Sequence, residues 1–128
     1  MIRVLLAEDQ AMVRGALSAL LRLESDMDVV ASAADGQEAW KLIEQHKPDV
    51  VVYDLIPPYE RQWQFLDHLR QTSPLNGIPF VITSCNEKAA RELGGRDELV
   101  HEVLGRPFDV AALIDAVRRA AKVEKATE

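Results

Sequence analysis

One short stretch, Val50–Pro58, limits the folds open to this chain more than any other. Four consecutive β-formers, Val50–Tyr53, run directly into Asp54, and two prolines follow shortly afterwards. An apolar run of this length suits a strand that is buried on both faces, as in a parallel sheet, and prolines cannot continue its hydrogen-bond ladder. The stretch therefore predicts a central strand that ends near Asp54, at the edge where open α/β sheets bind their ligands.

The start of the chain repeats this pattern. Ile2–Ala7 is a second apolar run, and it ends in Glu8 and Asp9. If the two strands are neighbours in a parallel sheet, Glu8, Asp9 and Asp54 meet at one edge. Three carboxylates at close range repel one another unless a cation lies between them, so the pattern predicts a metal ion or a basic side chain at this edge.

The rest of the chain alternates between strand and helix patterns with short connections. Apolar residues at helical spacing predict a helix after Asp9. Its inward face is expected to hold Val13, Ala16, Leu17, Leu20 and Leu21. Four further helices are predicted: one that begins at the capping residue Asp35, one over Glu60–Gln71, one over Asn86–Leu93 and one that follows Asp109. The other predicted strands are Asp28–Ala33, Ile78–Thr83 and an edge strand at Leu99–Leu104.

Five strand–helix units with right-handed crossovers predict a flavodoxin-like fold: a doubly wound, five-stranded parallel sheet with five helices. Two strand orders are common in such sheets, and the order 2-1-3-4-5 places the ends of strands one and three side by side. That order brings the acids of the two strand ends together, so the chemistry favours it. We expect one domain over residues 1–122 and a polar tail over residues 123–128.

Composition narrows the classes of function. The net charge of −6 leaves no basic stripe that could neutralise phosphates, so no nucleic-acid partner is expected. No apolar run approaches membrane-spanning length and the N-terminus is not signal-like, which predicts a cytoplasmic protein without a membrane partner. The one cysteine, Cys85, cannot form an internal disulfide and is expected to lie half-buried at a strand end.

The first acidic strand end lies within a segment that resembles a known family. Residues 2–10 and Asp35–Ala39 resemble the receiver domains of bacterial response regulators in two-component signalling, in particular those that carry a helix-turn-helix output. The resemblance extends over essentially the whole chain. It implies that Asp54 accepts a phosphoryl group, that Glu8 and Asp9 hold Mg²⁺, and that the backbone carbonyl of Ile56 completes the metal site.

The same resemblance assigns roles in the second half of the chain. Thr83 matches the hydroxyl residue that contacts the phosphoryl group, and Pro107 and Phe108 match the end of the family's Lys-Pro-Phe turn. These roles agree with the chemistry, because phosphoryl transfer to a carboxylate brings several negative charges together. A magnesium ion, a hydroxyl donor and a cation at position 106 would each offset part of that repulsion.

The second half also departs from the family pattern. Arg106 stands where the family has lysine, and Val103 stands where it has an aromatic residue that moves on activation. In the loop after Asp54, Gln62 stands where the family usually has glycine, and Arg61 stands where acidic residues are common in the family. An ordinary first half joined to an atypical second half fits divergence, and it also fits a hybrid or engineered chain (a chimera).

Two functions follow from these patterns. The first is a non-enzymatic switch that takes a phosphoryl group on Asp54 from a histidine kinase or phosphotransfer domain, with Mg²⁺, and acts through an output domain or a homodimer. The alternative is a degenerate, phosphorylation-independent interaction module in which Arg106 or Arg61 replaces the metal. In either case we expect the Arg106 guanidinium to lie against Asp54 or Asp9 in the metal-free protein. An aspartate-nucleophile phosphatase is disfavoured, because Ile56 stands where that class has a second aspartate.

Overall fold

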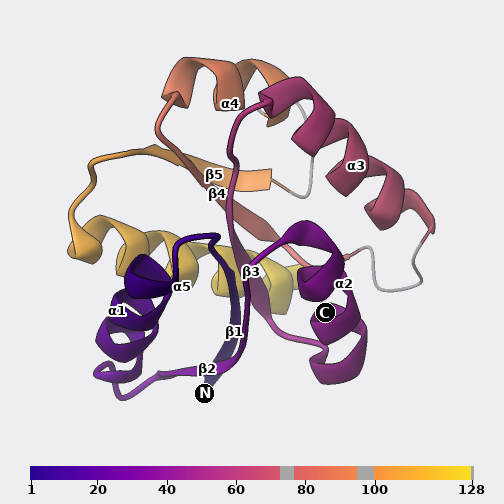
Figure 1. Cartoon of the computed structure of the whole chain (residues 1–128). Helices are drawn as coiled ribbons and strands as arrows, with labels where there is room; N and C mark the ends of the chain where they lie inside the picture. The colour runs from indigo at the N-terminus through magenta and orange to yellow at the C-terminus, as the bar shows by residue number, and fades with distance from the viewer. Residues whose placement is uncertain (73–76, 95–99, 128) are drawn as a thin grey trace.

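A computed structural model describes residues 1–72, 77–94 and 100–127 of the chain. In this part, parallel strands form one sheet in the order β2-β1-β3-β4-β5, which confirms the predicted fold (Figure 1). The strands are β1 (Ile2–Ala7), β2 (Met27–Ala33), β3 (Val50–Asp54), β4 (Phe80–Ser84) and β5 (Val100–Gly105). The helices are α1 (Ala11–Arg22), α2 (Gly36–His46), α3 (Tyr59–Thr72), α4 (Glu87–Gly94) and α5 (Val110–Thr127).

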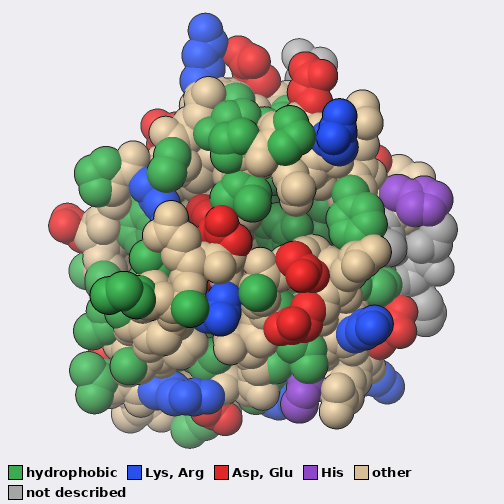
Figure 2. All heavy atoms as spheres, in the orientation of Figure 1, with side chains coloured by type: hydrophobic (Ala, Val, Ile, Leu, Met, Phe, Trp, Pro, Cys, Tyr) green, Lys and Arg blue, Asp and Glu red, His purple; other side chains and the backbone are tan. Residues whose placement is uncertain are grey.

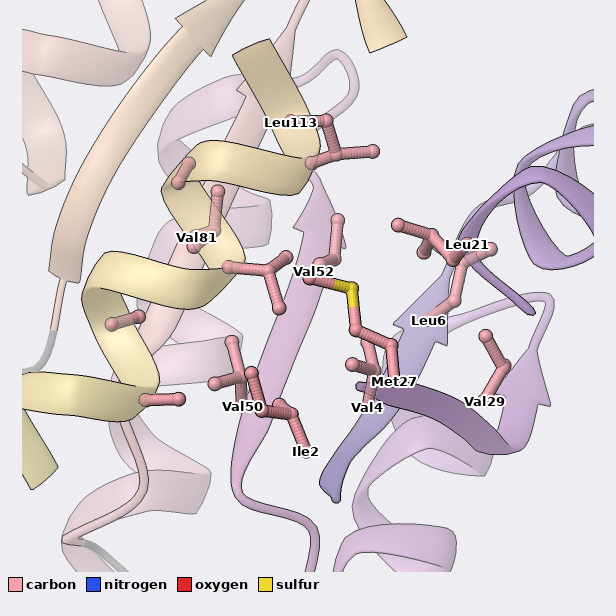
Figure 3. Packing of buried hydrophobic residues seen from close by; sticks show 14 of the residues in the cluster. Ile2, Val4, Leu6, Leu21, Met27, Val29, Val50, Val52, Val81 and Leu113 are labelled. Atoms are coloured by element: carbon pink, nitrogen blue, oxygen red, sulfur yellow. The ribbon is translucent and has the colours of Figure 1, made fainter. Parts of the chain in front are cut away.

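The sheet is the middle of three layers, with α1 and α5 on one face and α2, α3 and α4 on the other (Figure 1). Successive side chains of a strand point to opposite faces, so each central strand contributes to two separate cores. In β1, Val4 and Leu6 pack with α1 and α5, while Leu5 packs with the opposite helices. Figure 3 shows the first core, in which Leu21 of α1 and Leu113 of α5 approach the sheet.

The central strand β3 is buried along its length, as its composition predicts. Val50–Tyr53 are at most 3% exposed, and Asp54 follows them at the carboxyl end of the strand. The register pairs Ala7 of β1 with Tyr53, and Asp54 with Thr83 of β4. The ends of three neighbouring strands therefore bring their polar residues to the same edge of the sheet.

The prediction for the inward face of α1 was partly wrong. Leu17 and Leu21 are buried and Val13 is half-buried, but Ala16 is exposed and Leu20 is 37% exposed. The contacts of α1 with the sheet are to β1 and the edge strand β2, so only one narrow stripe of the helix meets the core. Because successive helical residues are about 100° apart, Ala16 and Leu20 turn away from that stripe.

Smaller differences concern the ends of elements. β4 begins at Phe80 rather than Ile78, and α5 continues to Thr127, so the backbone expected to form a tail is helical. Cys85 is exposed rather than half-buried. Leu99, where β5 was predicted to begin, lies outside the described residues. Among the described helices, none is both long enough and apolar enough to cross a membrane.

Candidate functional site

Three acidic side chains meet at the carboxyl ends of β1 and β3. Glu8 and Asp9 follow β1 directly, and Asp54 is the last residue of β3. One carboxylate oxygen from each residue lies within 4.8 Å of the other two. The structure therefore brings together the three acids that the sequence placed at one sheet edge, because their strands are parallel neighbours in register. Figure 2 shows acidic side chains near the middle of the molecular surface that is turned toward the viewer.

Glu8 is the most deeply buried member of this acidic cluster, with 2% of its surface exposed. Its Oε1 accepts a hydrogen bond from the backbone N–H of Gln10 (3.2 Å). Its backbone carbonyl accepts one from Nη1 of Arg14 (2.7 Å), and its N–H donates to the Ala33 carbonyl (2.9 Å). A buried carboxylate is costly unless it is paired, and these contacts hold Glu8 in place at the end of β1.

Arg106 supplies the positive charge that the cluster needs. Its Nη2 donates a hydrogen bond to Oε2 of Glu8, and its Nε lies 3.3 Å from Oδ1 of Asp54. Its side chain is 18% exposed, and its guanidinium carbon lies 5.9 Å from the centre of the Phe108 ring. The expected contact with Asp54 is present, but the second partner among the described acids is Glu8 rather than Asp9.

Two side chains, Thr83 and Arg106, approach Oδ1 of Asp54. Thr83, its neighbour on β4, donates a hydrogen bond from Oγ1 to Oδ1 at 2.8 Å. The Nε of Arg106 faces the same oxygen, but it is buried and its geometry makes no hydrogen bond within the described part of the chain. Arg106 therefore contacts Asp54 as an ion pair, whereas Thr83 forms a hydrogen bond with the same oxygen.

Burial and like charge both disfavour ionisation of this cluster. Burial raises the pKa of Glu8 above its ordinary value, and the nearby charge of Asp54 raises it further. Burial also raises the pKa of Asp54, against the opposing effects of the Thr83 hydrogen bond and the Arg106 charge. The pair is thus held in a state that favours an added cation or a bound proton.

A cavity of about 410 Å³ opens beside the acids, between the first turns of α2 and α3. Ile56 lines it, as do Arg61 and Gln62 from the atypical loop and α3. Its apolar walls include Tyr53, whose pKa burial raises to about 12. The site is therefore open on the side that faces α2 and α3.

Some of the residues that matter here had no signal in the sequence. Arg14 holds the Glu8 carbonyl and Phe108 lies beside the Arg106 guanidinium, yet neither contact follows from spacing or composition. Pro107 follows Arg106 in the turn after β5, where it was expected. Val103 is 4% exposed and belongs to the core that faces α2, α3 and α4.

Comparisons with known proteins agree with this geometry. A family model described as the response regulator receiver domain matches residues 4–118. The transcriptional regulatory protein PdtaR of Mycobacterium tuberculosis is 34% identical over 118 residues, which cover 92% of this chain and 56% of PdtaR. The oxygen regulatory protein NreC of Staphylococcus haemolyticus is 48% identical over 59 residues, or 45% of this chain and 27% of NreC. The chain thus spans about half the length of PdtaR.

A solved structure supports the same comparison. The crystal structure of a DNA-binding response regulator of the LuxR family from Staphylococcus aureus superposes with a TM-score of 0.80 at 25% sequence identity. The superposition covers 94% of this chain and 99% of that chain. The similarity therefore extends over both the ordinary and the atypical half of the sequence.

Proposed function

This chain belongs to the receiver domains of response regulators, and from that premise we propose that it accepts a phosphoryl group on Asp54. Receiver domains are in general signalling switches without an enzymatic output of their own. The observation that carries the proposal is the convergence of Glu8, Asp9 and Asp54, with the Thr83 hydroxyl bonded to the Asp54 carboxylate. We propose a histidine kinase or a phosphotransfer domain as the donor, and the cytoplasm as the compartment.

The proposed step is a nucleophilic substitution at phosphorus. A carboxylate oxygen of Asp54 forms the new P–O bond, while the P–N bond of a phosphohistidine breaks and the imidazole leaves with the electron pair. Thr83 already donates to this carboxylate and would hold its orientation. The Nε–H of Arg106 lies 3.3 Å from Oδ1 of Asp54 without a hydrogen bond among the described residues, so it would be available to donate to a phosphoryl oxygen carried by that carboxylate.

The acidic cluster also fits a magnesium ion. Receiver domains bind Mg²⁺ at an acidic pocket, and the donors here are carboxylate oxygens, the ligand type that Mg²⁺ prefers. Glu8, Asp9 and Asp54 would hold the ion, with the carbonyl of Ile56 as the proposed fourth protein ligand. When bound, the ion offsets the negative charge that gathers during transfer.

Arg106 supports a second candidate function. Its ion pairs with Glu8 and Asp54 already neutralise part of the cluster without a metal. A receiver in which arginine keeps this position would act as a phosphorylation-independent interaction module. An output domain or a second receiver is the proposed partner in either case, because the curated relatives are longer than this chain.

Labelling with acetyl phosphate or a phosphorylated kinase domain in Mg²⁺ separates the two functions. The switch predicts an acid-stable, base-labile acyl phosphate that Asp54→Asn abolishes. Asp35→Asn is the matched control, because Asp35 lines the same cavity and asparagine is an equally good helix cap, so labelling should persist. A folded wild-type protein that takes no label would favour the interaction module, and label that survives Asp54→Asn would place the acceptor elsewhere.

A further inference from the structure

The cavity beside the acidic cluster is bordered by an arginine that has no partner. Arg61 is the third residue of α3, it is exposed, and it is one of the residues that line this cavity of about 410 Å³. Among the described lining residues Arg61 is the one with a positive charge, and four others are acids: Glu8, Asp9, Asp35 and Asp54. The proposed phosphoryl acceptor and this cation therefore border the same cavity.

No contact within the protein accounts for the charge of Arg61. Within the described part of the chain its guanidinium forms no ion pair and no hydrogen bond, although acids line the same cavity. The residues three and four positions further along the helix, Gln64 and Phe65, carry no charge that could pair with it. A cation in the first turn of a helix is also disfavoured by the helix dipole. Such an uncompensated departure from the local rules is more usual at functional positions than elsewhere.

A phosphodonor that approaches Asp54 brings its negative charge toward a cluster of acids. Arg106 is already paired with Glu8 and Asp54, and a metal ion would be held by the acids themselves. Arg61 is the cation that remains unpaired, and it borders the cavity through which the cluster is open. A guanidinium offers several N–H donors in one plane, which suits the oxygens of a phosphoryl group.

From these observations we infer that Arg61 is a specificity-determining residue, which binds the phosphoryl group of the donor before transfer and favours dianionic over monoanionic donors. The inference rests on the proposed function, phosphoryl acceptance by Asp54. With acetyl phosphate, a carboxylate oxygen of Asp54 forms the new P–O bond, the bond from phosphorus to the acetyl oxygen breaks, and acetate leaves with the electron pair. Arg61 exchanges no proton in this step and contributes positive charge to the encounter.

Initial rates of acyl-phosphate formation with two small donors test the inference. Acetyl phosphate is a dianion near neutral pH, whereas phosphoramidate, with its protonated amine, is a net monoanion. At saturating Mg²⁺ and low donor concentration, Arg61→Gln should slow the reaction with acetyl phosphate at least about fivefold, and the reaction with phosphoramidate by a smaller factor. The loss should lie in the dependence on donor concentration, and it should shrink as the salt concentration rises.

Control variants separate donor binding from other effects. Arg61→Lys keeps the charge and should restore most of the rate with acetyl phosphate. Lys41→Gln removes the same charge from an exposed position of α2 that does not line the cavity, and it should leave both rates unchanged. Arg61→Gln should melt no lower than the wild-type protein, because it removes a cation from the first turn of α3.

Titration with inorganic phosphate, followed by NMR shifts of the amides in the first turn of α3, measures anion binding without transfer. Arg61→Gln should raise the phosphate dissociation constant at least severalfold. The inference is overturned, with Asp54 still the acceptor, if the wild-type protein takes label but Arg61→Gln reacts equally fast, slows both donors by the same factor or binds phosphate as tightly as the wild type. A wild-type protein that takes no label from either donor would instead overturn the proposed function, and this inference with it.

Discussion

At the scale of single residues, Arg106 is the departure from the family pattern with the clearest electrostatic effect. Its guanidinium reaches two acids at once, Glu8 through Nη2 and Asp54 through Nε. A lysine has one compact charge and could not span both carboxylates in this way. Arginine therefore contacts two acids of the cluster with its one charge, and a metal ion that uses both acids would have to compete with it.

Replacing Arg106 with lysine should strengthen magnesium binding. The lysine releases at least one carboxylate, so the Mg²⁺ dissociation constant should fall, by several-fold to about tenfold if roughly 1 kcal/mol of competition is removed. NMR shifts of the amides that follow β1 and β3, recorded through a magnesium titration, measure the constant. Arg61→Lys is the control, because Arg61 lines the cavity without pairing with the described acids. Equal affinities in wild type and Arg106→Lys would contradict this prediction.

The raised pKa values of Glu8 and Asp54 predict how stability depends on pH. The folded state binds protons at a higher pH than the unfolded state, where these groups titrate near 4.5 and 3.8. The contribution of these two groups to the free energy of unfolding in metal-free buffer should therefore be fully present below these ordinary values and be lost as the pH rises through the raised ones. Urea denaturation from about pH 4 to about pH 8 measures this slope.

Glu8→Gln should flatten that pH dependence, because it removes one of the two coupled groups. Glu44→Gln changes an exposed glutamate of α2 and should keep the wild-type slope. A Glu8→Gln variant whose stability depends on pH in the same way as that of the wild-type protein would contradict this prediction.

At the scale of elements, two glycines at helix positions should respond oppositely to alanine. A Cβ at Gly36, the first residue of α2, would lie 2.8 Å from the Tyr53 hydroxyl oxygen and 2.9 Å from Cε1 of Phe65. Gly36→Ala should therefore destabilise the protein by about 1–3 kcal/mol. A Cβ at Gly15 in α1 would meet nothing within 4 Å, so Gly15→Ala should stabilise it by about 0.5–1 kcal/mol. Thermal or urea unfolding of both variants checks the pair, and the same sign for both changes would contradict it.

The elements that the sequence predicted well are those whose residue pattern allows a single interpretation. Val50–Tyr53 and Ile2–Ala7 are continuous apolar runs with acids at their ends, so both the strands and the place where they meet follow from composition. The sequence did not predict which side of α1 packs on the sheet, because apolar residues occur on two sides of this helix and either side could be buried. Which of Leu17 and Leu20 is buried depends on how the helix lies on β1 and β2, which periodicity does not specify.

The candidate site shows the same division between local and distant information. The acids could be placed from the ends of their own strands, but the pairing of Glu8 with Arg106 joins residues 98 positions apart. Three acids at one sheet edge predict that a cation lies nearby. The sequence does not show which of the three carboxylates pairs with that cation, because the answer depends on how the side chains pack in the folded protein. Arg14 and Phe108 support the two partners through contacts that have no sequence signature.

At the scale of the whole molecule, magnesium should stabilise the fold. An ion that binds only the folded state adds RT ln(1 + [Mg²⁺]/Kd) to the free energy of unfolding, or about 2.7 kcal/mol at one hundred times the Kd. Asp9→Asn should remove most of this gain, whereas Asp35→Asn should retain it. Thermal melts across a magnesium series measure the effect. A melting temperature that does not change with magnesium in the wild-type protein would favour the arginine-filled site.

The position of Arg106 makes the edge strand β5 relevant to the competition between the guanidinium and a magnesium ion for the acidic cluster. The residue comes directly after β5, and β5 is held by Arg91 of α4 on the Val103 carbonyl (3.0 Å) and by Arg119 of α5 on Glu102 (2.6 Å). As long as β5 stays docked, the guanidinium is a tethered competitor whose effective concentration at the acids is on the order of millimolar or higher. A magnesium ion that binds the acidic cluster would therefore compete with a cation of the chain itself, and any event that loosens β5 should lower the magnesium concentration at which the ion binds.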